Sequence, residues 1–180
     1  AAKDIGFKVR GQALGYGAMF GKMLNKNGQY EIAEGYYNDM DVMWPSKVWQ
    51  PIDTKRVKEW DKVTNLSKTV KLTPSSKFGQ GDAPFRHLWV DKAGKMVRGP
   101  SRYITMVPAW HNADSLGYNP KTTGRKIDSW AELFSPDLKG KVALINTPQI
   151  GVMDAALGLE AMGLVKFKDK GDMSRQEIDA

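Results

Sequence analysis

A strand pattern that leads directly into a capped helix constrains the fold of this chain more than any other feature. Residues 142–145 form a short, continuous apolar run of the kind found in buried parallel strands. Thr147 and Pro148 follow, in the order of a helix N-cap and a first helical residue. The predicted helix continues to residue 162, and Gly163 ends it. We therefore expect a sheet with a helix packed against it in this part of the chain.

The same alternation of patterns runs through the rest of the sequence. The predicted strands are residues 7–10, 30–34, 86–90, 95–98, 103–107, 115–118 and 142–145. The predicted helices are residues 12–25, 39–44, 55–63 and 147–162. Residues 64–102 are weakly patterned, and their two strands are expected to form a hairpin on the surface. This order is typical of an α/β protein with a parallel or mixed sheet.

Composition argues against several classes of protein. No apolar run approaches the ~20 residues of a membrane span, and the absence of cysteine excludes disulfides and Cys-ligated metals. With only His87 and His111, we expect no metal site. The net charge is +7, but Lys and Arg form no run of five or six. We therefore expect a solubilising surface charge rather than nucleic-acid binding; a basic module for an acidic surface is the weaker alternative.

Both ends of the sequence carry helix signals. Residues 1–6 match the last turn of a helix, with Gly6 as its left-handed cap. Ser174 and Glu177 form a capping box that opens a helix close to the last residue. We therefore expect the chain to be part of a longer protein. The first residues lack the apolar segment of a signal peptide, which fits a cytosolic protein or an exported one that has been trimmed.

A polar and aromatic loop is the first candidate site. Trp110, His111, Asn112 and Asp114 lie within five residues between two predicted strands, where they can hold a small polar molecule. His111, Asp114 and Ser115 include the residue types of a hydrolytic triad, but they lie too close in sequence for its geometry. We therefore expect binding rather than catalysis. The structural alternative is that Trp110 and His111 form a packed corner.

Two predicted strand ends supply the other candidates. In open α/β sheets, ligands bind beyond the carboxyl ends of strands. Aromatic and polar side chains follow the strand at 30–34, and a helix start with free amide groups follows the strand at 142–145. The candidates at these two ends are Tyr36, Tyr37, Asn38, Asn146, Thr147 and Gln149. The structural alternatives are that the two tyrosines are half-buried surface residues and that Thr147 only caps the helix.

Four segments together resemble a known family. Residues 30–35 (YEIAEG), 49–53 (WQPID), 107–119 (VPAWHNADSLGYN) and 129–141 (SWAELFSPDLKGK) are similar, in order and spacing, to segments of spermidine/putrescine-type solute-binding proteins of bacterial ABC transporters. The resemblance covers nearly the whole chain and is weakest over residues 64–102. It implies a type II periplasmic binding protein fold, in which two α/β lobes are joined by hinge strands. Residues 1–108 would be part of lobe 1, and residues 109–180 the hinge crossing and first part of lobe 2.

The resemblance also implies a function and a site. A small polar metabolite, such as a polyamine or another amine-containing solute, would bind in the interlobe cleft and pass to a membrane permease for import. The full-length protein would be a periplasmic monomer, with its signal removed, that has no catalytic residue, cofactor or metal. The ligand-binding residues would be the following: Tyr36, Tyr37, Asn38, Trp110, His111, Asp114, Asn146, Thr147 and Gln149.

The chain departs from the polyamine pattern in one respect. Polyamine binders present carboxylates in the segment that corresponds to residues 146–149, and this chain has none there. Asp114 is the clearest acidic candidate that is left, whereas a dication usually needs more than one carboxylate. A ligand with one amine, or with an oxygen anion facing Thr147, fits equally well. Binding of an organic anion or a metal–anion complex, and an α/β transferase or hydrolase, are the alternative functions.

Overall fold

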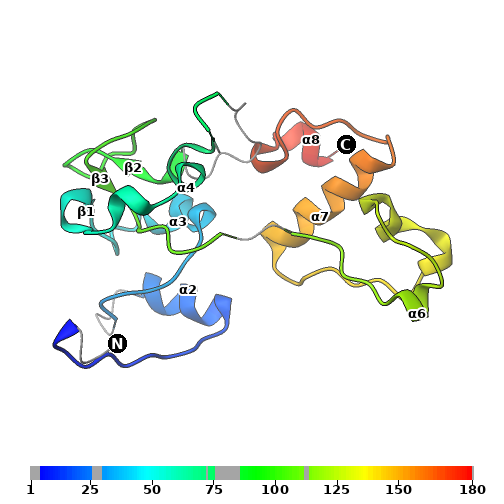
Figure 1. Cartoon of the computed structure of the whole chain (residues 1–180), viewed down its shortest axis with the longest axis horizontal. Coiled ribbons are helices and arrows are strands. Elements are labelled where there is room, and N and C mark those ends of the chain that lie inside the picture. Colours follow the sequence, from blue (N-terminus) through cyan, green and yellow to red (C-terminus); the bar gives the residue numbers. More distant parts are fainter. Residues whose placement is uncertain (1–4, 26–29, 72, 76–85, 112–113, 180) are drawn as a thin grey trace.

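The computed structural model describes residues 5–25, 30–71, 73–75, 86–111 and 114–179. Two groups of elements lie beside each other (Figure 1). The first, within residues 30–111, holds the strands with α3 and α4, and α2 lies to one side of it. The second, within residues 114–179, is helical and includes α6, α7 and α8. We call residues 5–111 the first part and residues 114–179 the second part.

A small antiparallel sheet organises the first part. Its strands are β1 (Ile52–Asp53), β2 (Trp89–Val90) and β3 (Tyr103–Ile104), in the order β1-β3-β2. Ile104 is the Cα partner of both Ile52 and Trp89. Among the described residues, the sheet contains no parallel pair, although the order of strand and helix patterns predicts one.

The core of the first part lies on this sheet. Leu88, Trp89 and Ile104 are buried together. The Trp89 indole donates a hydrogen bond to the Lys68 carbonyl oxygen at 3.0 Å, and its ring meets Trp60 edge-on at 5.8 Å. The prediction of a surface hairpin at residues 86–98 is therefore wrong in its placement. The turn and the Val90–Met96 bridge are present, but β2 is covered by aromatic side chains that come from distant segments.

Short helices complete the first part. They are α2 (Tyr16–Leu24), η1 (Tyr37–Asp39), α3 (Met40–Met43), η2 (Thr54–Arg56), η3 (Trp60–Lys62) and α4 (Asn65–Thr69). The helix predicted over residues 55–63 is thus two separate 3-10 turns. The buried Asp39 carboxylate accepts hydrogen bonds from the Tyr36 backbone N–H and the Tyr16 hydroxyl. Asp39 therefore ties α2 to the start of η1.

The second part is built around one long helix. Its elements are α6 (Pro120–Thr123), η4 (Trp130–Phe134), η5 (Pro136–Leu138), α7 (Pro148–Ala161), η6 (Lys170–Asp172) and α8 (Arg175–Asp179). The predicted ends of α7 are confirmed: Thr147 is the N-cap residue, and Gly163 follows the helix with φ +73°. The backbone N–H groups of Gly163 and Leu164 bond to the Glu160 and Leu159 carbonyls, which is a Schellman ending.

The signals at the two ends of the sequence are also confirmed within the described residues. Gly6 has φ +76°, the left-handed conformation predicted for a helix cap. The capping box of α8 is complete: the Glu177 N–H donates to Ser174 Oγ at 3.2 Å, and the Ser174 N–H donates to Glu177 Oε2 at 2.8 Å. The helix stop predicted at Gly28 lies outside the described residues.

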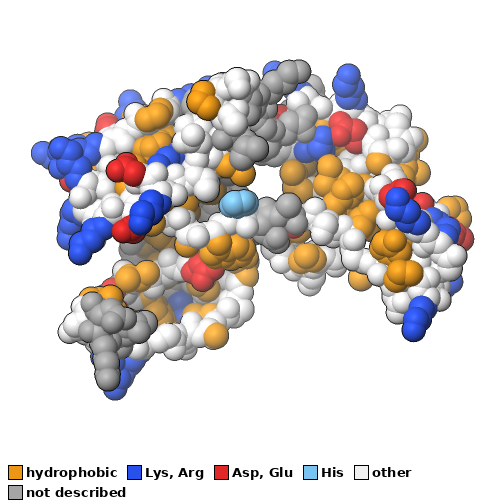
Figure 2. All heavy atoms as spheres, viewed as in Figure 1, with side chains coloured by type: hydrophobic (Ala, Val, Ile, Leu, Met, Phe, Trp, Pro, Cys, Tyr) orange, Lys and Arg blue, Asp and Glu red, His pale blue; other side chains and the backbone are white. Residues whose placement is uncertain are grey.

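Four predicted strands form no ladder with a described residue. They are residues 7–10, 30–34, 115–118 and 142–145. A strand gains stability only when it pairs within a sheet and covers its apolar face. Without that cover, Phe7, Val9, Ile32, Leu144 and Ile145 are exposed. Figure 2 shows hydrophobic side chains at the surface of the second part, over the region of α7.

Candidate functional site

A cavity of about 330 Å³ lies within the second part, and we call it the acidic cavity. Residues 115–119 form one wall and residues 141–145 another. Ile127 and Leu138, both largely buried, supply apolar lining. Asp154 of α7 contributes a carboxylate. The cavity therefore combines an apolar interior with one buried charge, the usual composition of a small-molecule site.

Asp154 is the most unusual residue of this cavity. Its side chain is only 6% exposed, and Oδ1 has no hydrogen-bond partner among the described residues. Burial raises the pKa of Asp154, and the negative charge of Asp114 raises it further. An ionised carboxylate that is buried without a cation or donor destabilises the folded protein. A cationic hydrogen-bond donor in the cavity would relieve both effects.

Two glycines explain how Asp154 comes to be buried. Gly151, Asp154 and Gly158 are spaced i, i+3 and i+7, so they share one face of α7. A Cβ added to Gly151 would lie 2.8 Å from the Ile145 carbonyl oxygen. One added to Gly158 would lie 2.5 Å from the Phe134 ring. The two glycines let α7 lie close against the wall at 141–145 and against η4, and Asp154 is enclosed between them.

The other charges of the cavity are arranged differently. Glu132 is held by Arg125, whose Nη1 and Nη2 donate at 2.7 and 2.5 Å. The hydrogen bond from Arg125 lowers the pKa of Glu132. Lys141 lines the cavity and is exposed. Among the described lining residues, the cavity thus offers one carboxylate without a hydrogen-bond partner, on Asp154, and one cation, on Lys141.

The predicted residues of the first part have mainly local contacts. Tyr37 packs against the core, and its hydroxyl donates to the Ser67 carbonyl oxygen at 3.2 Å. Burial raises the pKa of Tyr37. Tyr36 is 43% exposed and has its ring centroid 5.7 Å from that of Tyr16. Asn38 is exposed. Tyr36 and Asn38 are therefore accessible to a solute, whereas Tyr37 is held in the core.

The predicted loop residues are exposed where described, and they differ in the segments with which they interact. Trp110 is exposed, and its indole N–H donates to Glu34 Oε1 at 2.9 Å, which joins the loop to the segment before Tyr36. His111 is exposed. Asp114 is also exposed, and its charge acts on Asp154. Asn112 lies outside the described residues.

The predicted residues at the start of α7 occupy the expected positions without the expected contacts. Thr147 is the N-cap, but its side chain accepts no capping hydrogen bond. Asn146 is exposed, and Gln149 lies in the first turn of α7. No hydrogen bond, ion pair or ring contact between described residues joins residues 146–147 to residues 36–38. Among the described residues, the two predicted walls of the site thus share no direct polar contact, and the acidic cavity is lined by residues of the second part.

Sequence reasoning missed Asp154, although a signal was present. An acidic residue within a mainly apolar stretch of a helix, with glycine three residues before it and four after it on the same face, indicates close packing around a carboxylate. Among the residues described, no group of three or more His, Asp or Glu side chains is placed to hold a metal ion. No described helix is long and apolar enough to cross a membrane.

Comparison with known proteins adds no assignment to this geometry. No family model, no curated protein and no solved structure matches the chain.

Proposed function

We propose that the protein is a non-enzymatic receptor for a small, amine-containing polar solute, and that the acidic cavity binds the amine. The observation that carries the proposal is the buried Asp154 carboxylate, whose Oδ1 has no partner among the described residues. A hydrogen bond between an ammonium group and a carboxylate contributes about 1.5–3 kcal/mol. The amine would supply the missing donor and the missing positive charge at once.

The surroundings of Asp154 favour a cation further. Asp114 adds a second negative charge whose field reaches Asp154. A diamine can place one ammonium near each carboxylate. Lys141, which also lines the cavity, can pair with an oxygen anion of the solute. An amino acid-like solute, with an amine for Asp154 and a carboxylate for Lys141, is therefore the second member of the proposed ligand class.

The family resemblance supports the same class of function. The cavity walls, residues 115–119 and 141–145, overlap two of the segments that resemble solute-binding proteins of ABC transporters. We therefore extend the proposal to a periplasmic receptor of the type II binding-protein fold that delivers its solute to a permease. Ligand would favour a closed state only by binding that state more tightly.

Calorimetric titration of the chain at pH 7 tests the proposal. The probes are 1,4-diaminobutane, 4-aminobutanoate and the neutral 1,4-butanediol. We expect at least one of the two amines to bind and the diol not to bind, because only an ammonium group completes the Asp154 site. The variant Asp154→Asn should weaken amine binding about tenfold or more, as expected for a lost charged hydrogen bond.

The variant Asp128→Asn is the matched control. Asp128 is exposed, lies outside the cavity and pairs with Lys126 at 3.2 Å, so its loss should leave amine binding unchanged. Equal amine affinity in the Asp154→Asn variant would overturn the proposed site. Binding of simple carboxylates to the acidic cavity, without amine binding, would favour the organic-anion alternative and overturn the proposed ligand class.

A further inference from the structure

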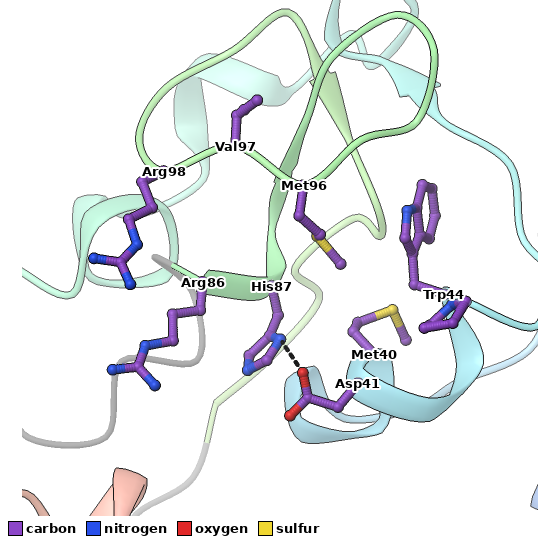
Figure 3. Close-up of a pocket in the computed structure, with 9 residues that line it drawn as sticks. Met40, Asp41, Trp44, Arg86, His87, Met96, Val97 and Arg98 are labelled. Atoms are coloured by element: carbon purple, nitrogen blue, oxygen red, sulfur yellow. Dashed lines mark ion pairs between the residues drawn. The ribbon is translucent and has the colours of Figure 1, made fainter.

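A second cavity, of about 350 Å³, lies in the first part and has the opposite charge (Figure 3). We call it the arginine cavity. Arg86 and Arg98 extend to one side of it, and Met40, Trp44 and Met96 gather on the other. The cavity therefore has a cationic end and an apolar end. None of its lining residues was predicted as a site residue from the sequence.

The cationic end already attracts a carboxylate from the second part. Arg86 Nη2 lies 2.5 Å from Asp172 Oδ2. The hydrogen bond from Arg86 lowers the pKa of Asp172, and the positive charges of Arg98 and Lys168 contribute to the same shift. Arg86 thus contacts the Asp172 carboxylate directly, and Arg98 adds a favourable positive charge. A planar guanidinium is well suited to hold such a group.

Arg98 retains capacity for another anion. It is exposed, and it forms no ion pair with any residue that the structure describes. His87 lies between the arginines and the apolar end, and its Nδ1 is 3.4 Å from Asp41 Oδ1 (Figure 3). Asp41, which also lines the cavity, is therefore turned toward His87.

The apolar end is held in place by backbone contacts. The Trp44 indole N–H donates to the Gly94 carbonyl oxygen at 2.6 Å. Met40 is fully buried, and Met96 forms the backbone bridge to Val90. This end is therefore fixed before a ligand binds, which lowers the entropy lost on binding.

We propose that the arginine cavity binds a small organic carboxylate with an apolar body, the carboxylate at Arg98 and Arg86 and the body against Trp44 and Met96. This site is distinct from the acidic cavity in place and in charge, so it does not depend on the function proposed above. Asp172 competes for Arg86, and the solute must share that guanidinium or displace Asp172 from it.

Titration of the isotope-labelled chain with phenylacetate tests the proposal, with the indole N–H resonance of Trp44 as the reporter of site. Phenylacetate combines a carboxylate with an aromatic body. 2-Phenylethylamine and 2-phenylethanol keep the body and replace the anion. We expect only phenylacetate to shift the Trp44 signal in a saturable way, because only the anion pairs with the arginines.

Three variants sharpen the test. Arg98→Met should weaken phenylacetate binding about tenfold, the effect of losing one charged hydrogen bond. Asp172→Asn should tighten it severalfold, because one internal competitor for Arg86 is removed. Arg56→Met replaces an exposed arginine outside the cavity and should have no effect.

Two results would overturn the proposal. One is binding of 2-phenylethanol as tight as that of phenylacetate, which would make the cavity an apolar pocket without anion selectivity. The other is the absence of saturable phenylacetate binding in both the natural chain and the Asp172→Asn variant. The amine titrations test the acidic cavity with ligands of the opposite charge. Either proposal can therefore fail while the other is still supported.

Discussion

The two cavities of this protein differ in whether their charged side chains are paired. In the arginine cavity, Arg86 pairs with Asp172 across the two parts of the molecule, and His87 lies near Asp41. In the acidic cavity, Asp154 is buried with an oxygen that no described residue satisfies. The first arrangement stabilises the protein without a ligand. The second is destabilising until a ligand completes it, and unsatisfied groups of this kind are common at functional sites.

The two parts also differ in packing. Leu88 and Ile104 of the first part are fully buried, at 0% exposure. The most buried large aliphatic residues described in the second part, Ile127 and Leu138, are 9% exposed and line a cavity. The first part therefore has a continuous core on a sheet, and the second part has a helix packed around open volume. The following predictions test this difference, from the largest expected effect to the smallest.

Truncating one leucine side chain in each part should lower the free energy of unfolding by different amounts. Leu88→Ala should lower the free energy of unfolding by about 3 kcal/mol, because it leaves a cavity in a closed core. Leu138→Ala should lower it by about 1–2 kcal/mol, because the side chain already borders empty volume. Urea denaturation measures both values. Equal losses would show that the second part is packed as tightly as the first.

Replacing a glycine by alanine should change the free energy of unfolding in opposite directions in α7 and in α2. Gly158→Ala should lower the free energy of unfolding by about 1 kcal/mol, because the new Cβ would lie 2.5 Å from the Phe134 ring and 3.1 Å from the Trp130 carbonyl oxygen. The gain in helix propensity, about 1 kcal/mol, does not offset that clash. Gly21→Ala in α2 meets no atom within 4 Å and should stabilise by up to about 1 kcal/mol. Thermal or urea unfolding compares them, and stabilisation by both would contradict the packing inferred for α7.

Neutralising the buried carboxylate should stabilise the protein without ligand. Asp154→Asn should raise the free energy of unfolding by about 1 kcal/mol at pH 7, because it removes an unpaired buried charge. The pKa of Asp154 is raised on folding, so the charged form is destabilising above that pKa. The gain should shrink as the pH falls through the raised pKa of Asp154, and it should vanish below 3.8, the ordinary pKa, where the natural side chain is protonated in both states. Urea unfolding from pH 7 to pH 4 measures this trend, and a pH-independent difference would contradict it.

The paired carboxylate of Asp53, in the first part, should have its pKa shifted in the opposite direction, below the ordinary value. The hydrogen bond from Arg102, which donates to Asp53 at 2.5 and 3.0 Å, lowers the pKa of Asp53 to about 2. The stabilisation from this pair is complete above the ordinary pKa of 3.8 and is lost as the pH falls toward 2. Carboxyl NMR titration should show the low value, and Arg102→Met should return it toward 3.8. An unchanged pKa in that variant would show that Arg102 is not the cause.

Local signals in the sequence predicted the ends of elements well. Pro148 begins α7, Gly163 ends it, and the capping box of Ser174 and Glu177 opens α8. Each of these features depends on residues within a few positions of one another. The predicted pairing of strands depended on distant segments, and periodicity alone does not state which segments meet. The α/β binding-protein fold therefore stays a proposal.

The candidate site was predicted in part. The sequence pointed to Asp114 and to the start of α7; the charge of Asp114 acts on Asp154, whereas Asn146 and Thr147 are not among the described residues that line the acidic cavity. It gave no indication that Tyr37 donates to the Ser67 carbonyl, because that contact joins segments 30 residues apart. Asp154 carries no strand-end signal, because it lies in the second turn of a helix and not in a loop that follows a strand.

Two of the segments that form no ladder with a described residue bear on how this chain behaves at high concentration. Phe7 with Val9, and Val142 with Leu144, present alternating apolar side chains at the surface. Such segments are templates for pairing with other chains. The net charge of +7 opposes that contact over the Debye length, about 10 Å at 0.1 M salt and about 3 Å at 1 M. Solubility is therefore controlled by ionic strength, and low salt is the condition that keeps the chains apart.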